Sequence, residues 1–188
     1  MEAEQTANPF RLLALGVQIR NALDEALRLD PENVEVRIDL VRFHMTAPGI
    51  IGGDVGEAKA QAAEITRRDA PLGSFARGYI AYRRKEYGAA RRELREAVRT
   101  ARDATARSRA AKWLGWLSQE TRQYDEAFAM WESLRASERE EALYEIGRTS
   151  VFCSCELERG RSALEEYLRV KDAKHAAEAK KLLEKLRP

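Results

Sequence analysis

Apolar residues recur every three or four positions along most of the chain, and charged side chains occupy most positions between them. This spacing predicts amphipathic helices rather than strands. The first predicted helix covers 9–31, where Asn8 and Pro9 favour a helix start and Asp30–Pro31 favours an end. Further helices are predicted over 34–45, 55–68, 73–84, 87–101, 105–121, 124–136, 139–156, 160–171 and 174–186.

Small and bulky residues in the middle of the chain recur after a constant interval of 37 residues. The first copy contains Gly78, Tyr87, Ala90 and Leu94. The second copy contains, in the same order, Gly115, Tyr124, Ala127 and Trp131, and a fainter third copy contains Gly147, Ala163 and Tyr167. Repeats of about 34 residues built from two helices are typical of helical solenoids. Because one such unit cannot bury its apolar face alone, we expect the units to stack.

The repeated residues resemble those of the tetratricopeptide repeat (TPR) family. That family has a glycine between large residues in the first helix, as in Ala76–Tyr82 and Trp113–Trp116. It also has an aromatic residue at the turn, as at Tyr87 and Tyr124. The resemblance implies an all-α, right-handed α-solenoid of stacked helix pairs, with about nine to ten helices. It also implies that the first helices line a concave groove, which holds a peptide or a helix of a partner.

We therefore predict a single TPR-like domain over 1–188. Its predicted parts are the N-terminal helix 9–31, a divergent repeat with a Gly-rich loop 34–70, repeats 71–104 and 105–138, a divergent repeat 139–173 and a capping helix 174–188. Gly115 is expected to let two helices approach closely, with Ala127 opposite it. Gly147 and Ala163 are further apart, so we expect longer helices or a wider turn in the last repeat.

The segment 47–56 interrupts the helical pattern with one proline and four glycines. Its Ala-Pro-Gly and Gly-Gly-Asp sequences are similar to a little-characterised bacterial subgroup of TPR proteins, which implies no particular partner. Because the spacing is not that of a phosphate-binding loop, we expect an elaborated connection with Ile50 and Ile51 packed on the core. His44 and Asp54 flank the loop and could form a catalytic pair, although a histidine at a helix end usually caps or packs.

Helical spacing from the repeat glycines assigns a basic and aromatic lining to the groove. The predicted partner-binding residues are Arg42, Phe75, Tyr79, Tyr82, Arg83, Arg109, Lys112, Trp116, Tyr144 and Arg148, with Leu72, Gln119 and Phe152 at further inward positions. Aromatic residues and arginine dominate interface energetics. Because arginine binds carboxylates bidentately, this lining favours an acidic segment or a C-terminus as the partner. In the alternative interpretation, the rings are inter-helix core and the arginines form a solvated face.

These observations predict a non-catalytic protein–protein interaction module. One alternative is an RNA-binding solenoid, because arginines are frequent between 83 and 109. Another is a self-associating scaffold, which would use the first helix, since a partner helix for it is missing before Asn8. We expect no catalytic residues, cofactor or metal, because the motifs of the common catalytic and metal sites are missing.

Composition and cysteine usage add three expectations. The net charge of only +2 does not favour general binding to polyanions. Without a membrane-length apolar stretch or a basic-then-apolar leader, the sequence predicts a cytoplasmic protein, or a periplasmic one if a leader was removed. Cys153 and Cys155 are two positions apart in a helical pattern, where side chains do not face each other, so we expect no disulfide between them.

Overall fold

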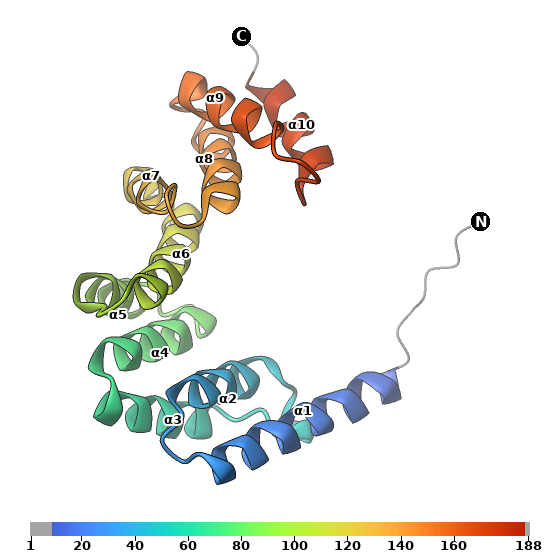
Figure 1. Cartoon of the computed structure of the whole chain (residues 1–188), viewed down its shortest axis with the longest axis vertical. Coiled ribbons are helices and arrows are strands. Elements are labelled where there is room, and N and C mark those ends of the chain that lie inside the picture. Colours follow the sequence, from blue (N-terminus) through green and yellow to red (C-terminus); the bar gives the residue numbers. More distant parts are fainter. Residues whose placement is uncertain (1–8, 187–188) are drawn as a thin grey trace. The chain divides into compact units, whose positions relative to one another are not determined.

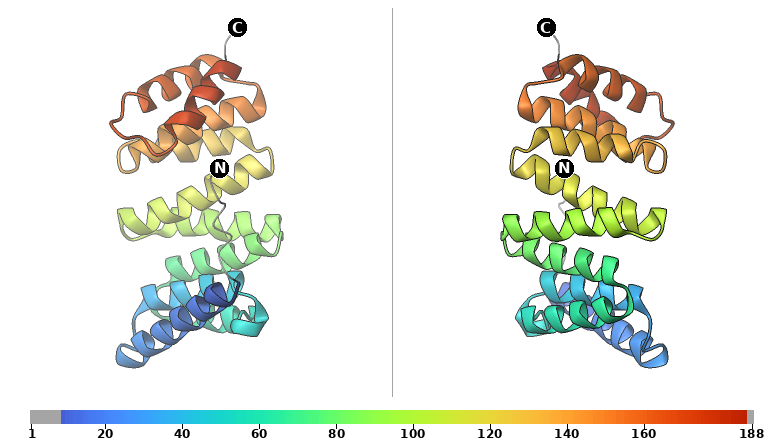
Figure 2. Two further views of the ribbon diagram at one scale, coloured as in Figure 1. Left: turned by 90° about the vertical axis from the view of Figure 1, so that its right-hand side faces the viewer. Right: turned by 90° about the vertical axis from the view of Figure 1, so that its left-hand side faces the viewer.

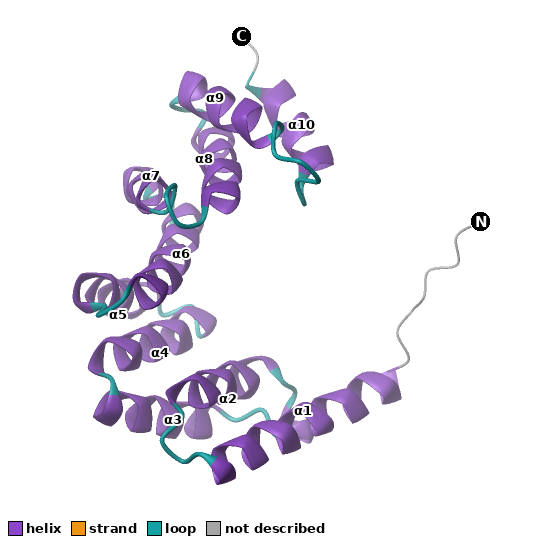
Figure 3. Ribbon diagram, viewed as in Figure 1, coloured by secondary structure: helices purple, strands orange, loops and turns teal. Residues whose placement is uncertain are grey.

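In the computed structural model, the described residues 9–186 form ten α-helices, one short 3-10 helix and connecting loops, without a strand (Figure 3). The helices lie close to their predicted positions. The chain divides between Glu86 and Tyr87 into two compact units. None of the helices within 9–186 combines the length and the apolar character needed to cross a membrane.

The first unit, up to Glu86, contains α1 (Pro9–Leu29), α2 (Val34–Thr46), the 3-10 helix η1 (Gly49–Ile51), α3 (Val55–Arg68) and α4 (Ala70–Arg83). Within it, α1 packs on α2 and η1, α2 packs on α3, and α3 packs on α4 (Figure 1). The core of these helices includes Ile38, Leu40, Val41, Ala58 and Ile65.

Side-chain caps determine where three helices of the first unit begin. Asn33, Asp54 and Asp69 each precede a helix, and each side chain accepts a hydrogen bond from a backbone N–H in the first turn. Such caps satisfy donors that have no partner inside the helix. The spacing of Asp54 and Glu57 in the sequence is that of a capping box, and the Asp54 carboxylate accepts from the Glu57 N–H at 3.0 Å. The cap predicted at Asn8 lies outside the described residues.

The Gly-rich connection is held between α1 and α2. Gly52 has a φ of 99°, a left-handed conformation that favours glycine. His44 Nδ1 lies 2.8 Å from the Gly52 carbonyl oxygen, and the Ile51 side chain packs against Gly16 of α1. Ile50 is 84% exposed, so the expectation that it packs on the core is wrong, because the turn of η1 directs only Ile51 inward.

The second unit, from Tyr87, contains α5 (Tyr87–Thr100), α6 (Ala104–Glu120), α7 (Tyr124–Ser133), α8 (Arg139–Cys153), α9 (Leu157–Tyr167) and α10 (Ala176–Lys185). Each helix packs on the next one along the chain, and α10 packs on both α8 and α9. Figure 2 shows the helices of this unit as successive layers. The burial of Ala179, Leu182 and Leu186 fits the predicted role of α10 as a cap for this stack.

Trp131 fills the centre of the second unit. Its side chain is fully buried, and its ring lies against Gly115, where a Cβ atom would be 2.6 Å from a ring carbon. Gly115 therefore allows α6 and α7 to pack closely, as predicted. The side chain opposite it, however, is the Trp131 ring rather than Ala127, because this ring occupies the space that the glycine leaves.

The last helix pair is not enlarged, so the expectation of longer helices or a wider turn is wrong. α8 has 15 residues and α6 has 17, and three residues follow each of them before the next helix starts. The expectation failed because it treated Ala163 as the counterpart of Ala127. The small residue that lies against α8 is Gly160, at Ser150.

Ser137 and Glu140 have the spacing of a capping box, but this box does not form. α8 begins at Arg139, after Glu138, and no side chain caps this start. The Ser137 hydroxyl instead lies 3.2 Å from the hydroxyl of Ser108 on α6. The spacing alone was misleading because the helix starts one residue later than the box requires.

Candidate functional site

A cleft of about 1190 Å³ lies in the second unit between α6, α8 and α10, and we call it the α8 cleft. Its aromatic lining consists of Trp116, Tyr144, Phe152, Tyr167 and His175. Its charged lining consists of Glu138, Arg139, Glu140, Glu141, Glu145, Arg148, Asp172, Lys174 and Glu178. Ser137 and Leu182 complete the lining.

The rings of the α8 cleft are fixed by other rings. Trp116 lies edge-on to Trp113, with ring centroids 5.3 Å apart, and tilted against Trp131 at 5.9 Å. Tyr144 stacks on His175 at 4.7 Å. Phe152 differs from these residues because it is 49% exposed. The cleft therefore offers one large accessible ring beside a rigid aromatic wall.

The Tyr144 hydroxyl is directed to Glu178 of α10. Burial, followed by the hydrogen bond to Glu178, raises the pKa of Tyr144 far above its usual range. The phenol therefore remains a neutral donor at every physiological pH. A second bond holds the same region, because the His175 backbone N–H donates to the Tyr167 hydroxyl at 2.7 Å.

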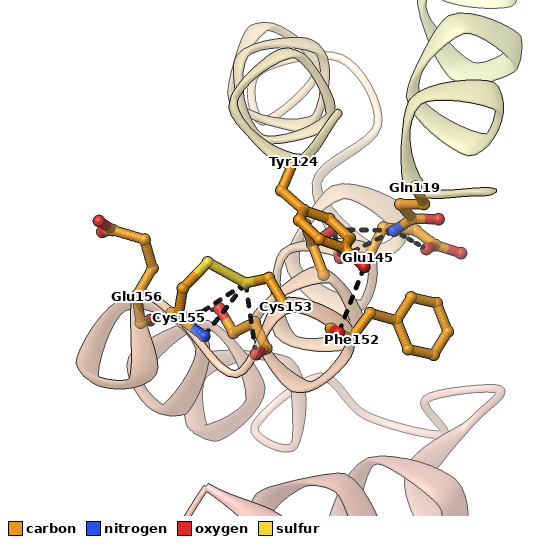
Figure 4. The surroundings of a disulfide bond; sticks show 9 residues. Gln119, Tyr124, Glu145, Phe152, Cys153, Cys155 and Glu156 are labelled. Carbon is orange, nitrogen blue, oxygen red and sulfur yellow. Dashed lines mark hydrogen bonds between the residues drawn. A yellow bond between two sulfur atoms is a disulfide. The ribbon is translucent and has the colours of Figure 1, made fainter. Parts of the chain in front are cut away.

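Glu145 lies at the base of the α8 cleft and connects α6 to α8. The residue is only 4% exposed. Its carboxylate accepts hydrogen bonds from Trp116 Nε1 at 3.2 Å, from Gln119 Nε2 at 2.9 Å and from Arg148 at 2.7 Å. Figure 4 shows the Gln119 amide directed at this carboxylate. Gln119 also donates to the Thr149 hydroxyl at 2.8 Å. Buried charges require such partners.

Sequence reasoning assigned Gln119 and Arg148 to the groove but missed Glu145. The signal was present, because Glu145 precedes Arg148 by three positions and so shares its helix face. An acidic residue between the apolar positions of a buried helix also indicates a buried hydrogen-bonded group.

Arg148 is already bound within the protein. Its guanidinium group pairs with Glu145 and lies 5.1 Å from the Phe152 ring centroid and 6.0 Å from that of Tyr144. These contacts combine an ion pair with cation–π attraction. Arg148 therefore lines the cleft as predicted, but its charge is balanced by Glu145.

The lining as a whole is acidic, which corrects the predicted basic lining. Six carboxylate side chains face three lysine and arginine side chains. Lys112 was predicted to bind a partner, but its Nζ atom lies 3.4 Å from Glu138 and 3.3 Å from Glu141. The prediction used only inward positions on the first helices. It therefore omitted the first turn of α8 and all of α10, which supply most of the carboxylates.

The predicted site residues fall into two groups. Trp116, Tyr144 and Arg148 meet in the α8 cleft, Lys112 forms ion pairs with two of its lining residues, and Arg109 is half-buried on α6.

The other five predicted residues belong to the first unit. Phe75 and Tyr79 are only 2% and 4% exposed, so their rings offer no surface to a partner. Tyr82 is half-buried and Arg83 is exposed at the end of α4. Arg42 pairs with Asp39 on the surface of α2.

Cys153 and Cys155 form a disulfide at the end of α8, so the expectation that they remain unpaired is wrong (Figure 4). The helix ends at Cys153, and Ser154 follows with a left-handed φ of 52°. This residue turns the chain back and brings the two Cα atoms to 5.0 Å. The expectation assumed that the helix continues to 156. The disulfide directly follows Phe152, which lines the cleft, and the Phe152 carbonyl accepts a hydrogen bond from the Tyr124 hydroxyl.

Within residues 9–186, the structure brings no three side chains of His, Cys, Asp and Glu close enough to hold a metal ion. His44 and Asp54 have structural contacts instead. His44 forms a hydrogen bond with the Gly52 carbonyl, and Asp54 caps α3.

The sequence matches no protein-family model, and no curated protein matches it. Its fold is nevertheless similar to two solved structures. A crystal structure of MamA protein is 22% identical, with a TM-score of 0.56 over 85% of this chain and 83% of that one. A second crystal structure of MamA is 21% identical, with a TM-score of 0.52 over 87% and 86% of the two chains.

The all-α fold expected from the sequence is thereby confirmed, while membership of the TPR family and of the bacterial subgroup suggested by the Gly-rich loop stays a prediction. The chain has the all-α fold of a TPR-like helical solenoid.

Proposed function

We propose that this protein is a non-catalytic interaction module that holds a peptide or helix of a protein partner in the α8 cleft. The observation that carries the proposal is the Phe152 ring, 49% exposed beside Trp116 and Arg148 in a cleft of about 1190 Å³. Accessible aromatic rings next to arginine in a concave site are typical of interface hot spots. The TPR-like fold supports the same role, because solenoids of this kind use extended surfaces for binding.

The base of the cleft is preorganised for binding. Glu145 ties Trp116 and Gln119 of α6 to Arg148 of α8, and His175 stacks on Tyr144. Because these side chains are already ordered, binding a partner would cost little free energy for ordering the site.

Nucleic-acid binding is less well supported, because many arginines of the basic middle segment are paired. Arg91 and Arg95 both contact Glu126, and Arg99 contacts Glu96. Paired arginines contribute less to the positive potential that phosphate recognition requires.

Self-association is a second candidate, which the outer face of α1 favours. Leu12, Leu15, Val17 and Ile19 are 55%, 51%, 44% and 46% exposed. Leu12, Leu15 and Ile19 share one side of α1, whereas Val17 lies on the opposite side, and three exposed apolar residues on one side form the kind of patch that marks an interface.

Replacing Phe152 with serine is expected to reduce partner capture by roughly tenfold or more, since a central aromatic anchor is lost. The measurement is quantitative affinity capture from an extract of the source organism, with circular dichroism to verify the helical content. Leu157→Ser is the matched control, because Leu157 is 42% exposed and does not line the cleft. Equal recovery of the same proteins by wild type and by both variants would contradict the assignment of the cleft.

A double variant, Leu12→Glu with Leu15→Glu, should remove any self-association that uses α1. We expect multi-angle light scattering to show a lower mass for this variant than for the wild-type chain, because charges on the patch oppose its burial. A monomeric wild-type protein over the accessible concentration range would exclude this candidate.

A further inference from the structure

We infer that the segment bound in the α8 cleft is basic and amphipathic, with apolar side chains on Phe152 and Trp116 and with lysine or arginine facing the carboxylates. This inference rests on the proposed function, and it names the chemistry of the partner at the same site. The expected charge of the partner is thus opposite to that of the acidic segment favoured by the sequence.

The carboxylates of the cleft carry charge that the protein does not neutralise. Glu140 accepts a hydrogen bond from the Lys174 backbone N–H, and Glu178 accepts one from the Tyr144 phenol. Both donors are neutral, so neither hydrogen bond brings a positive charge to these carboxylates. Glu138 and Glu141 share a single cation, Lys112.

Two of the three cations in the lining already have ion-pair partners in the protein, although Glu166, the partner of Arg139, also binds Arg135; the third cation is Lys174. Arg148 pairs with the buried Glu145 at 2.7 Å. Arg139 pairs with Glu166 of α9 at 2.6 Å, and this hydrogen bond lowers the pKa of Glu166. A carboxylate of an acidic partner would therefore meet six lining carboxylates against three cations, and this excess of negative charge disfavours acidic segments.

The overall charge of the chain does not attract a basic segment. The net charge of the whole chain is +2, so long-range electrostatics would weakly repel a polycation. Binding of a basic probe must then come from a local acidic surface. The apolar part of the same cleft, the exposed Phe152 and the half-buried Trp116, suits the apolar face of a helix.

Two synthetic peptides test the inference. Each is a blocked amphipathic helix of about 18 residues with the same leucine positions, and its polar positions are lysine in one peptide and glutamate in the other. Their dissociation constants are measured with the full chain by isothermal titration calorimetry at about 50 mM and 200 mM salt. We expect the lysine peptide to bind roughly tenfold tighter than the glutamate peptide, with a difference that shrinks as salt rises.

Charge-neutral variants locate the binding. Glu140→Gln with Glu178→Gln should weaken the lysine peptide by roughly three- to tenfold. The control, Glu165→Gln with Glu184→Gln, removes the same charge from exposed carboxylates of α9 and α10 that do not line the cleft. It should change the dissociation constant of the lysine peptide by less than about twofold. Phe152→Ser should weaken both peptides.

The outcomes separate the two proposals. Equal or tighter binding of the glutamate peptide, lost in Phe152→Ser, would overturn the basic partner and leave the α8 cleft as the binding site. Equal effects of the cleft and control glutamine variants would also overturn it. Peptide binding that is insensitive to Phe152→Ser, or no binding of either peptide, would count against the cleft itself and thus against the proposed function.

Discussion

Replacing Trp131 with alanine should lower the free energy of unfolding by about 3–5 kcal/mol. The ring is fully buried in the core of the second unit and lies against Trp116 and Gly115. Among the described residues its indole N–H has no hydrogen-bond partner, so the loss arises from packing alone. Urea denaturation followed by circular dichroism measures the change.

Gly115 provides an independent test of the same contact. Gly115→Ala alone should cost about 1–3 kcal/mol, because its Cβ would lie 2.6 Å from the Trp131 ring. In the Trp131→Ala background the Cβ has room, so the cost should vanish or reverse in a double-mutant cycle. Gly88→Ala on α5 is the matched control, since nothing lies within 4 Å of its Cβ and the better helix propensity should stabilise by about 0.5–1 kcal/mol. Additive effects of the Gly115 and Trp131 changes would show that the contact is energetically unimportant.

The helices could be predicted because their signals are local. Apolar periodicity and caps such as Asp54 depend on residues within a few positions of each other, and these fixed the starts of α3, α5 and α7. The repeated spacing of Gly78 and Gly115 identified the repeat from the sequence, and close packing of α6 on α7 at Gly115 gives the physical reason for the second of these glycines. The residue opposite Gly115 was not predictable in the same way, since it depends on how deeply the Trp131 ring enters the interface.

The candidate site was predicted only in part, because its charge depends on distant segments. Spacing on the first helices found Trp116, Tyr144 and Arg148. It could not show that Glu178 of α10 lies next to Tyr144, since this contact requires the loop between α9 and α10 to fold back. The disulfide was missed for a related reason: one left-handed residue, Ser154, ends α8 three residues earlier than periodicity suggested.

Replacing Glu145 with alanine is expected to lower the free energy of unfolding by about 2–3 kcal/mol. Removing one partner of a buried ion pair typically costs about 3–5 kcal/mol. The expected loss is smaller here because the Arg148 side chain is 30% exposed, so water can solvate it. The remaining cost comes from Trp116 Nε1 and from Gln119, which lose an acceptor at the base of the cleft.

Two measurements distinguish this loss from a general effect of substitution. Glu184→Ala removes an exposed carboxylate from α10 and should change the free energy of unfolding by less than about 0.5 kcal/mol. In nuclear magnetic resonance spectra, the Trp116 indole N–H signal should shift in Glu145→Ala, because its hydrogen bond to the carboxylate is gone. An unchanged signal and a loss no larger than that of Glu184→Ala would mean that Glu145 does not hold α6 against α8. The cleft would then lack the preorganised base on which tight binding depends.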